Sequence, residues 1–151
     1  MISKILVPTD GSEIASKSVK YAAGLAKQLG ATITLLSVID INVDVFFAQT
    51  VSAVNSPTHL KEPIEDYLRQ AAGAYIKEGE RICNKNSIQS KKVIRSGHPV
   101  EEIINEAVKS KVDLIVMGSQ GRSALKAAFL GSVTFGVIHK DTKTPVLVVR
   151  K

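Results

Sequence analysis

The apolar residues change period several times along the chain, alternating between short runs typical of strands and longer stripes typical of helices. The first two runs are rich in β-branched residues and are flanked by glycine or aspartate, as strands commonly are. Five strands are predicted in all: Ile5 to Val7, Ala31 to Val38, Lys92 to Arg95, Val112 to Met117 and Pro145 to Arg150.

Helices are predicted between these strands, each from one apolar stripe at helical spacing. The first stripe is Ala15, Val19, Ala22, Ala26 and Leu29, with Gly30 as its C-terminal stop. The second, in a helix from about Pro63 to Lys85, is Ile64, Leu68, Ala71, Tyr75 and Ile82. The third follows Pro99 and is Val100, Ile103, Ile104, Ala107 and Val108. A fourth helix is predicted near Ser132 to Lys140, whereas Ile41 to Lys61 match neither period and are interpreted as a long connection.

Alternating strands and helices imply right-handed crossovers and a parallel sheet covered on both faces. We therefore predict an α/β fold, an open five-stranded parallel sheet in an α/β/α sandwich. No internal repeat, low-complexity tract or linker indicates a second domain, so residues 1–151 are interpreted as a single domain.

Composition agrees with one globular domain, because 44% of the 151 residues are hydrophobic and 23% are charged. This balance excludes a disordered chain and a coiled coil. Cys83 is the single cysteine, which excludes an internal disulfide and favours a reducing compartment. No export signal and no apolar run of roughly 20 residues is present, so we expect a cytoplasmic protein without a membrane span.

The formal charge of +6 favours an anionic partner. Aromatic residues make up only 5% of the chain, tryptophan is absent, and the basic residues are dispersed, which disfavours nucleic acid. A small phosphorylated ligand suits the charge equally well.

Two loops carry the candidate chemistry, because ligands of such sheets bind at the carboxyl ends of the strands where the strand order reverses. The first loop is Pro8 to Ser12, and the second begins at Gly118. Two residues separate Gly118 from Gly121, nine separate Gly121 from Gly131, and Ser132 follows directly. Glycines let successive amides converge on one anion, and a helix start favours negative charge, so this spacing predicts a phosphate cradle.

Asp10 requires another role, since a carboxylate beside phosphates repels them unless a cation intervenes. It suits a ribose hydroxyl, or a magnesium ion that bridges to phosphate. Alternatively, Asp10 with Glu13 acts as a capping box at the start of the first helix, and both roles can coexist.

With these motifs the chain resembles the universal stress protein family, in its ATP-binding type. The resemblance runs from about Ile2 to Arg150. It is carried by VPTDGS (7–12), SGHPVEEI (96–103), DLIVMGSQGRS (113–123), GSVT (131–134) and PVLVVR (145–150). It implies a Rossmann-like fold of the adenine nucleotide alpha-hydrolase type and a bound ATP, or AMP or ADP, with Mg²⁺. It also implies a stress-response regulatory protein that acts on a protein partner which the sequence does not identify.

The resemblance also assigns residues to the nucleotide. Asp10 would contact the ribose, Pro8 and Thr9 would line the nucleotide cleft, and the backbone of Val38 would bind adenine. The residues around ribose and phosphates would be Met117, Gly118, Gly121, Arg122, Gly131, Ser132 and Val133. Ser37 stands where many relatives carry histidine, and Ile41 to Lys61 contain no motif that aligns.

No catalytic residue is assigned. The chain lacks a P-loop motif, GxGxxG and GxSxG, and its three histidines show no metal-ligand spacing. Slow hydrolysis of ATP or another nucleotide at the same site is the alternative function. The last predicted strand, Pro145 to Arg150, is expected at a sheet edge, where a second copy would pair to form a homodimer.

Overall fold

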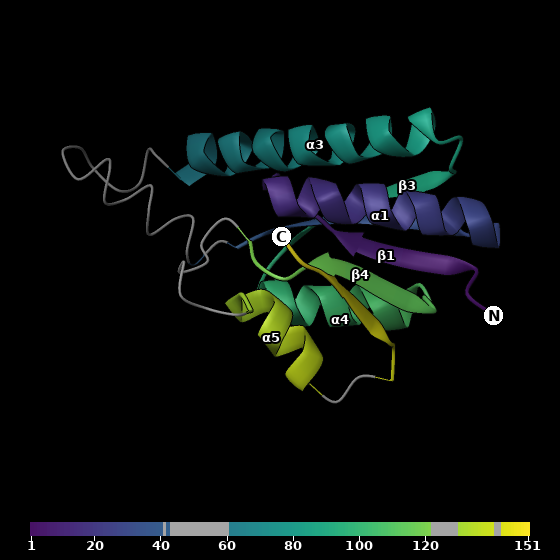
Figure 1. Cartoon of the computed structure of the whole chain (residues 1–151). Helices are drawn as coiled ribbons and strands as arrows, with labels where there is room; N and C mark the ends of the chain where they lie inside the picture. The colour runs from purple at the N-terminus through teal and green to yellow at the C-terminus, as the bar shows by residue number, and fades with distance from the viewer. Residues whose placement is uncertain (41, 43–60, 122–129, 141–142) are drawn as a thin grey trace.

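Strands and helices alternate along the chain, and the strands pair in parallel in one sheet (Figure 1). The computed structural model describes residues 1–40, 42, 61–121, 130–140 and 143–151. Its strands are β1 (Lys4–Pro8), β2 (Thr32–Ile39), β3 (Ser90–Ser96), β4 (Leu114–Gly118) and β5 (Val146–Val149). Its helices are α1 (Glu13–Leu29), α3 (Lys61–Lys85), α4 (Pro99–Lys109) and α5 (Ser132–His139). The predicted α/β fold with five parallel strands is confirmed.

The strand order is β3-β2-β1-β4-β5, which places β1 at the centre of the sheet. The chain builds β1, β2 and β3 toward one edge and then returns to place β4 and β5 on the other side of β1. The order therefore reverses between β1 and β4, where such sheets bind ligands. β5 forms one edge of the sheet, as predicted.

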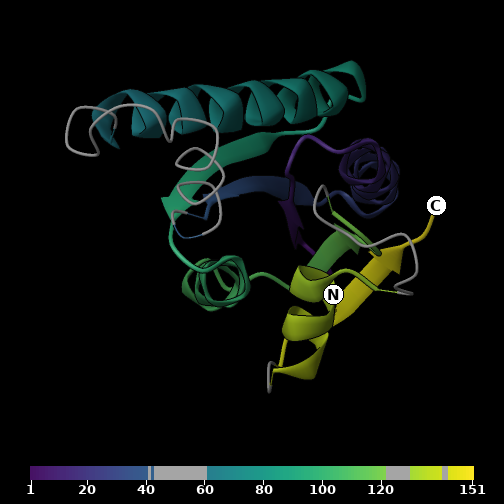
Figure 2. The same cartoon turned by 90° about the vertical axis from the view of Figure 1, so that its left-hand side faces the viewer.

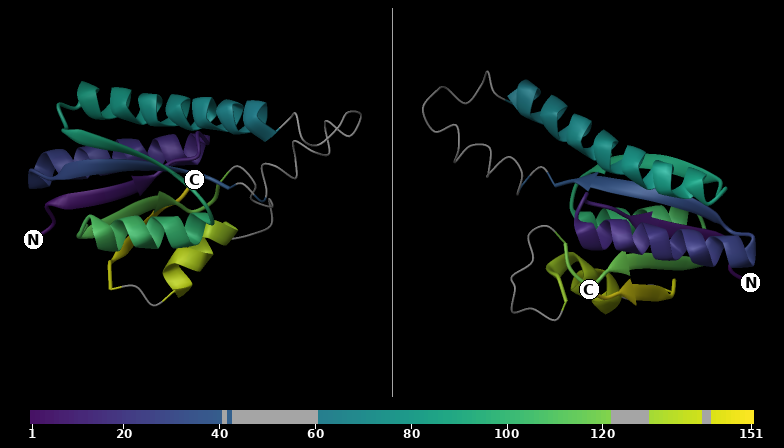
Figure 3. Two further views of the ribbon diagram at one scale, coloured as in Figure 1. Left: turned by 180° about the vertical axis from the view of Figure 1, so that it is seen from behind. Right: turned by 45° about the horizontal axis from the view of Figure 1, so that its top comes forward.

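Side chains of β1 alternate between two apolar layers, one on each face of the sheet. Ile5 and Val7 pack with buried residues of α1 and α3, whereas Leu6 packs with those of α4 and α5. Figures 2 and 3 show α1 with α3 on one face and α4 with α5 on the other. Because β1 is buried on both faces, its sequence reads as a continuous apolar run.

Helix α1 begins at Glu13, shortly after β1 ends at Pro8, and Ser12 is its N-cap. The Ser12 hydroxyl accepts a hydrogen bond from the Ala15 N–H at 3.2 Å. The prediction that Asp10 caps this helix was therefore wrong. Asp10 instead accepts from the Ser12 N–H at 2.9 Å, because Gly11 turns the chain between the two residues.

Helix α3 presents a slightly different face to the sheet than its apolar stripe predicted. Its most deeply buried side chains are Ala72, Ile76, Ile82 and Cys83, whereas Ile64, Leu68, Ala71 and Tyr75 are half-buried. A Cβ built on Gly79 would lie 3.1 Å from the Leu35 side chain, so Gly79 lets α3 approach β2 closely and sets its rotation. Burial raises the pKa of the Cys83 thiol, as expected for a packing residue.

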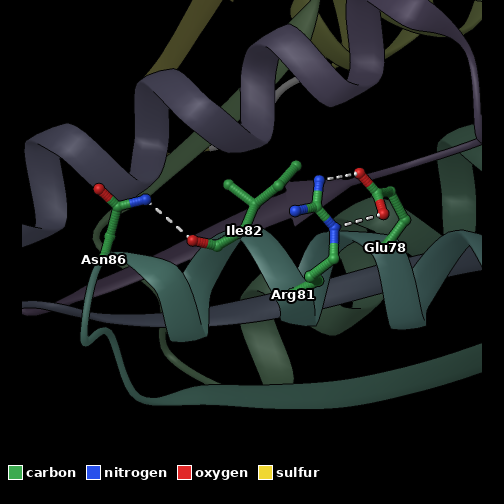
Figure 4. A network of polar contacts seen from close by, with 4 residues as sticks. All are labelled: Glu78, Arg81, Ile82 and Asn86. Atoms are coloured by element: carbon green, nitrogen blue, oxygen red, sulfur yellow. Dashed lines mark hydrogen bonds and ion pairs between the residues drawn. The ribbon is translucent and has the colours of Figure 1, made fainter.

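Polar side chains form hydrogen bonds along the C-terminal part of α3 (Figure 4). The Asn86 side chain donates to the Ile82 carbonyl at 2.9 Å and so satisfies one carbonyl of the last turn. Arg81 forms two hydrogen bonds with Glu78, both on the exposed surface. Such an exposed pair contributes little to stability, whereas the Asn86 bond fixes where the helix ends.

Two other apolar positions predicted on buried faces are exposed. Leu29 at the end of α1 is 45% exposed, and Val108 at the end of α4 is 67% exposed. Both lie in the last turn of their helices, where the chain leaves the sheet. Within the described residues, no helix combines the length and apolarity needed to cross a membrane.

Alanine substitutions at two glycines test separately how helix propensity and backbone conformation affect the stability of the fold. Gly73 lies inside α3 and Gly30 caps α1 with φ of 67°, and a Cβ at either position would meet nothing within 4 Å. We expect Gly73→Ala to raise the free energy of unfolding by about 1 kcal/mol. Gly30→Ala should lower it by about 1 kcal/mol, because alanine is strained in the left-handed region. Urea denaturation of both variants checks this, and equal effects would contradict it.

Glu106 links α4 to the edge strand β3 and gives the fold a pH dependence. Its buried carboxylate accepts hydrogen bonds from the Ser110 hydroxyl and, at 3.0 Å, from Arg95. Burial alone would raise the pKa of Glu106, but these bonds outweigh burial and lower it. Glu106→Gln should therefore lower the free energy of unfolding by about 2 kcal/mol at neutral pH.

This loss should fade as the pH falls, since the native contacts of Glu106 favour its charged form. The contribution is complete above the unfolded-state pKa of about 4.3 and disappears as the pH passes through the lower pKa of the folded protein. Denaturation curves between pH 7 and 3 measure it. Glu101→Gln, on the exposed side of the same helix, is the control and should change little.

Candidate functional site

The loops that follow β1 and β4 meet at the carboxyl end of the sheet. A Cβ built on Gly121 would lie 2.7 Å from the Asp10 Oδ2 atom, although 111 positions separate the two residues. Parallel pairing of Ile5 with Leu114 and of Leu6 with Ile115 brings the two strand ends to the same level. The sheet thus joins the two motifs that the sequence singled out separately.

The β1 loop holds the Asp10 carboxylate in a defined position. The Thr9 N–H donates to the Leu36 carbonyl at 2.8 Å, and Thr9 itself is buried. The Asp10 Oδ1 atom accepts from the Ser12 N–H, while Oδ2 lies toward Gly121. Gly11 between them has φ of 77°, a conformation that favours glycine. Pro8, the last residue of β1, is half-buried beside this loop.

The β4 loop is tied to the start of α5 by hydrogen bonds across the intervening segment. The Gly131 N–H donates to the Ser119 carbonyl at 2.7 Å, and the Thr134 hydroxyl donates to the Gly118 carbonyl at 2.7 Å. The Ser119 N–H in turn donates to the Val149 carbonyl of β5 at 2.8 Å. Residues 118, 119, 131 and 134 thus close this loop onto the sheet.

Gly131 allows the backbone of α5 to approach the β4 loop. A Cβ at this position would lie 3.2 Å from the Gln120 Cα and 3.4 Å from the Gly121 nitrogen. Gly131 is the N-cap residue of α5 and makes no side-chain capping hydrogen bond. Since the Gly131 N–H is used by Ser119, the amides that the helix start presents begin at Ser132 and Val133. No acidic residue lies in this first turn, so the positive end of the helix dipole is unopposed there.

Val38 lies where β2 extends past the end of β1. The β1–β2 ladder ends at the Pro8–Leu36 pair and the bond from Thr9 to Leu36. Backbone groups of successive residues in a strand point to opposite neighbouring strands, so those of residues two apart point to the same one. The Ile39 carbonyl accepts from Gly97 beyond β3, so the N–H and C=O of Val38 point to the β1 side, as those of Leu36 do. They therefore face the region beyond the end of β1.

Met117 and Gly118, the last residues of β4, are both buried. The Met117 side chain packs in the apolar layer that includes Leu36 and Val137, so it lies beneath the loops. A Cβ on Gly118 would lie 3.1 Å from the Ile14 side chain and 3.2 Å from the Gln120 carbonyl oxygen, which leaves little room for a larger residue. Arg122 and, apart from Asn42, residues 41–60 of the Ile41 to Lys61 connection lie outside the described residues.

Three contributors to this region had no role assigned from the sequence. Thr134 was part of a recognised motif, but only its bond to Gly118 gives it a role. Ser12 holds the start of α1. The Tyr75 ring lies against Gly11, a contact between distant helices and loops that no local pattern signals. Among the residues that the structure describes, no three His, Cys, Asp or Glu side chains are grouped as metal ligands.

Comparisons of sequence identify the family of the chain. The model of the universal stress protein family matches residues 1–150. Universal stress protein YxiE of Bacillus subtilis is 33% identical, with 99% of this chain and all of YxiE covered. Universal stress protein MJ0577 of Methanocaldococcus jannaschii is 34% identical, with 100% and 96% of the two chains covered.

Comparisons of structure give the same result. The solved structure of MJ0577 superimposes with a TM-score of 0.82 at 32% identity, covering 100% of this chain and 97% of that one. The fold is shared with a universal stress protein solved with cAMP, at 21% identity and a TM-score of 0.68, over 99% and 97% of the two chains. It is also shared with one from Archaeoglobus fulgidus solved with dAMP, at 17% identity and a TM-score of 0.68, over 98% and 97%. This chain belongs to the universal stress protein family.

Proposed function

We propose that this chain binds an adenine nucleotide, ATP or its products ADP and AMP, where the β1 and β4 loops meet, and that binding regulates a stress response. The observation that carries the proposal is the position of the Asp10 carboxylate against Gly121. A sugar-binding group and a glycine loop suited to phosphates thereby share one location. The cAMP and dAMP bound by proteins of this fold support the ligand class.

The ribose and phosphates would bind opposite parts of this site. The Asp10 carboxylate would accept hydrogen bonds from ribose hydroxyls, which are donors. The phosphates would lie on the other side, beside the Gly118 to Gly121 loop and against the amides of Ser132 and Val133 at the start of α5. Gly131 would contribute by its small size, since its own N–H is used by Ser119. Arg122 follows Gly121 directly and would add positive charge near the phosphates.

The adenine ring would bind beside the exposed backbone at the end of β2. Val38 presents one donor and one acceptor there, and adenine offers the complementary pair along its edge. Pro8 and Thr9 would line the same region from β1, with Met117 beneath it. A backbone edge of this kind recognises the base whatever side chain stands at Ser37, so the absence of histidine there does not weaken the proposal.

Mg²⁺ would reach this site with the phosphates. Bound to ATP, it neutralises part of the phosphate charge. Asp10 is the only carboxylate in residues 8–12 and 118–131. In our proposal this carboxylate binds the ribose. No second carboxylate of these segments is then left to activate water, so we propose binding rather than turnover as the function.

Measuring the unfolding temperature at increasing ATP concentrations tests nucleotide binding directly. ATP at 100 times its dissociation constant should add about 2.7 kcal/mol to the free energy of unfolding. Parallel titrations with ADP and AMP show how much the phosphate groups contribute to the affinity. If none of the three shifts the transition, the proposed function fails.

Gly121→Ala tests the contact that carries the proposal. The added methyl group would lie 2.7 Å from the Asp10 Oδ2 atom and would displace the carboxylate. We expect the Kd for ATP, measured by calorimetry, to rise about tenfold, equal to about 1.4 kcal/mol. Gly24→Ala inside α1 is the matched control, because its methyl group meets nothing within 4 Å and should leave the Kd unchanged. Equal affinity in the two variants would contradict the placement of the site.

We also propose that a second copy of the chain pairs along β5. Val149 and Pro145 direct their carbonyls to β4, so the backbone groups of Val146 and Val148 point to the outer edge. Val148→Pro removes one outward N–H and no bond to β4. We expect a dimer in sedimentation velocity for the unaltered chain and a monomer for this variant. A monomer at all concentrations without any substitution would refute the pairing.

A further inference from the structure

The Tyr75 ring of α3 occupies the place that a side chain would take on Gly11. A Cβ built on Gly11 would clash with the Cδ1 and Cε1 atoms of Tyr75. The ring therefore lies directly on the backbone of the β1 loop. Tyr75 as a whole is half-buried.

This contact acts on the residue that orients Asp10. Gly11 lies inside the turn that the hydrogen bond from the Ser12 N–H to the Asp10 Oδ1 atom closes. Its φ in this turn is 77°. Any shift of Gly11 changes this turn and moves the carboxylate. The Thr9–Leu36 bond holds the loop from the side of the sheet, and the Tyr75 ring holds it from the helix layer.

We infer that Tyr75 is a positioning residue, whose ring fixes the Gly11 turn and thereby makes the Asp10 carboxylate select nucleotides that carry ribose hydroxyls. This inference rests on the proposed function and adds a residue outside both loops. Tyr75 acts through Asp10 and does not touch the ligand. It belongs to α3, which packs independently on β2 through Gly79 and Leu35, so the ring is held by an element that the loops do not control.

The alternative is that Tyr75 only fills space between α3 and the loop. The two roles predict different effects of a Tyr75 substitution on the preference for nucleotides that carry ribose hydroxyls. General loosening of the site weakens all adenine nucleotides alike, whereas a misplaced carboxylate weakens only ligands that it binds. The ratio of Kd values for 2′,3′-dideoxy-ATP and ATP therefore separates them, because only ATP carries the ribose hydroxyls.

Calorimetric titration of both nucleotides into the full chain measures this ratio. We expect Tyr75→Ala to weaken ATP binding about tenfold and to bring the ratio close to one. Tyr75→Phe keeps the ring on Gly11 and should retain both the affinity and the ratio. Tyr67→Ala, on the same helix but 70% exposed, is the matched control and should change neither. If Tyr75→Ala fails to fold, Tyr75→Leu removes the ring while retaining most of the volume.

A double-mutant cycle with Asp10→Ala completes the test. If Tyr75 acts through Asp10, Tyr75→Ala should cost nothing further once the carboxylate is gone. The inference is overturned if Tyr75→Ala keeps the ratio of the unaltered chain, if Tyr75→Phe behaves like Tyr75→Ala, or if the two substitutions are additive. A chain that binds no adenine nucleotide refutes the proposed function instead, and one that binds both nucleotides equally refutes the role of Asp10 on which Tyr75 depends.

Discussion

Parallel pairing between β1 and β4 is the constraint on which the rest of the structure depends. The paired residues are 109 positions apart in the chain, yet the Ile5–Leu114 and Leu6–Ile115 pairs align the carboxyl ends of the two strands. The pairing is possible because Leu6 and Ile115 are fully buried on one face while Ile5 and Val116 are fully buried on the other. Apolar burial on both faces holds the two strands together, and the register of their pairing decides which loop residues meet. This pairing is what brings Asp10 and Gly121 together.

The same constraint explains why the site is built from backbone as much as from side chains. β2 continues past the end of β1, so Val38 directs its peptide groups toward the region that β1 leaves open. On the other side, Thr134 and Ser119 bind the loop to β4 and β5, which positions the start of α5 near Gly121. Amides held in this way need no reorganisation when an anion binds.

Much of this arrangement could be predicted from the sequence, and the failures have identifiable causes. The strands were predicted within about two residues of their ends, and in β1 and β4 burial on both faces leaves an unbroken apolar run. The predicted buried face of α3 is shifted by one residue from the observed face. The close approach of Gly79 to Leu35 depends on how α3 packs on β2, which the sequence of α3 alone does not indicate. Asp10 was predicted as a helix cap because a glutamate follows three positions later, but the left-handed turn at Gly11 moves that role to Ser12. The roles of the site residues stay predictions.

The two interpretations of Asp10, as part of the turn before α1 and as a ligand group, are compatible because its carboxylate has two oxygens. Oδ1 accepts from the Ser12 N–H and so stabilises the turn, while Oδ2 lies toward Gly121. A carboxylate fixed by one oxygen presents the other in a defined direction and loses less entropy when it binds a hydroxyl. In the proposed site, the hydrogen bond from Ser12 would therefore orient the carboxylate for recognition as well as stabilise the turn, and Gly121 would let the carboxylate keep its position, because a side chain there would meet Oδ2.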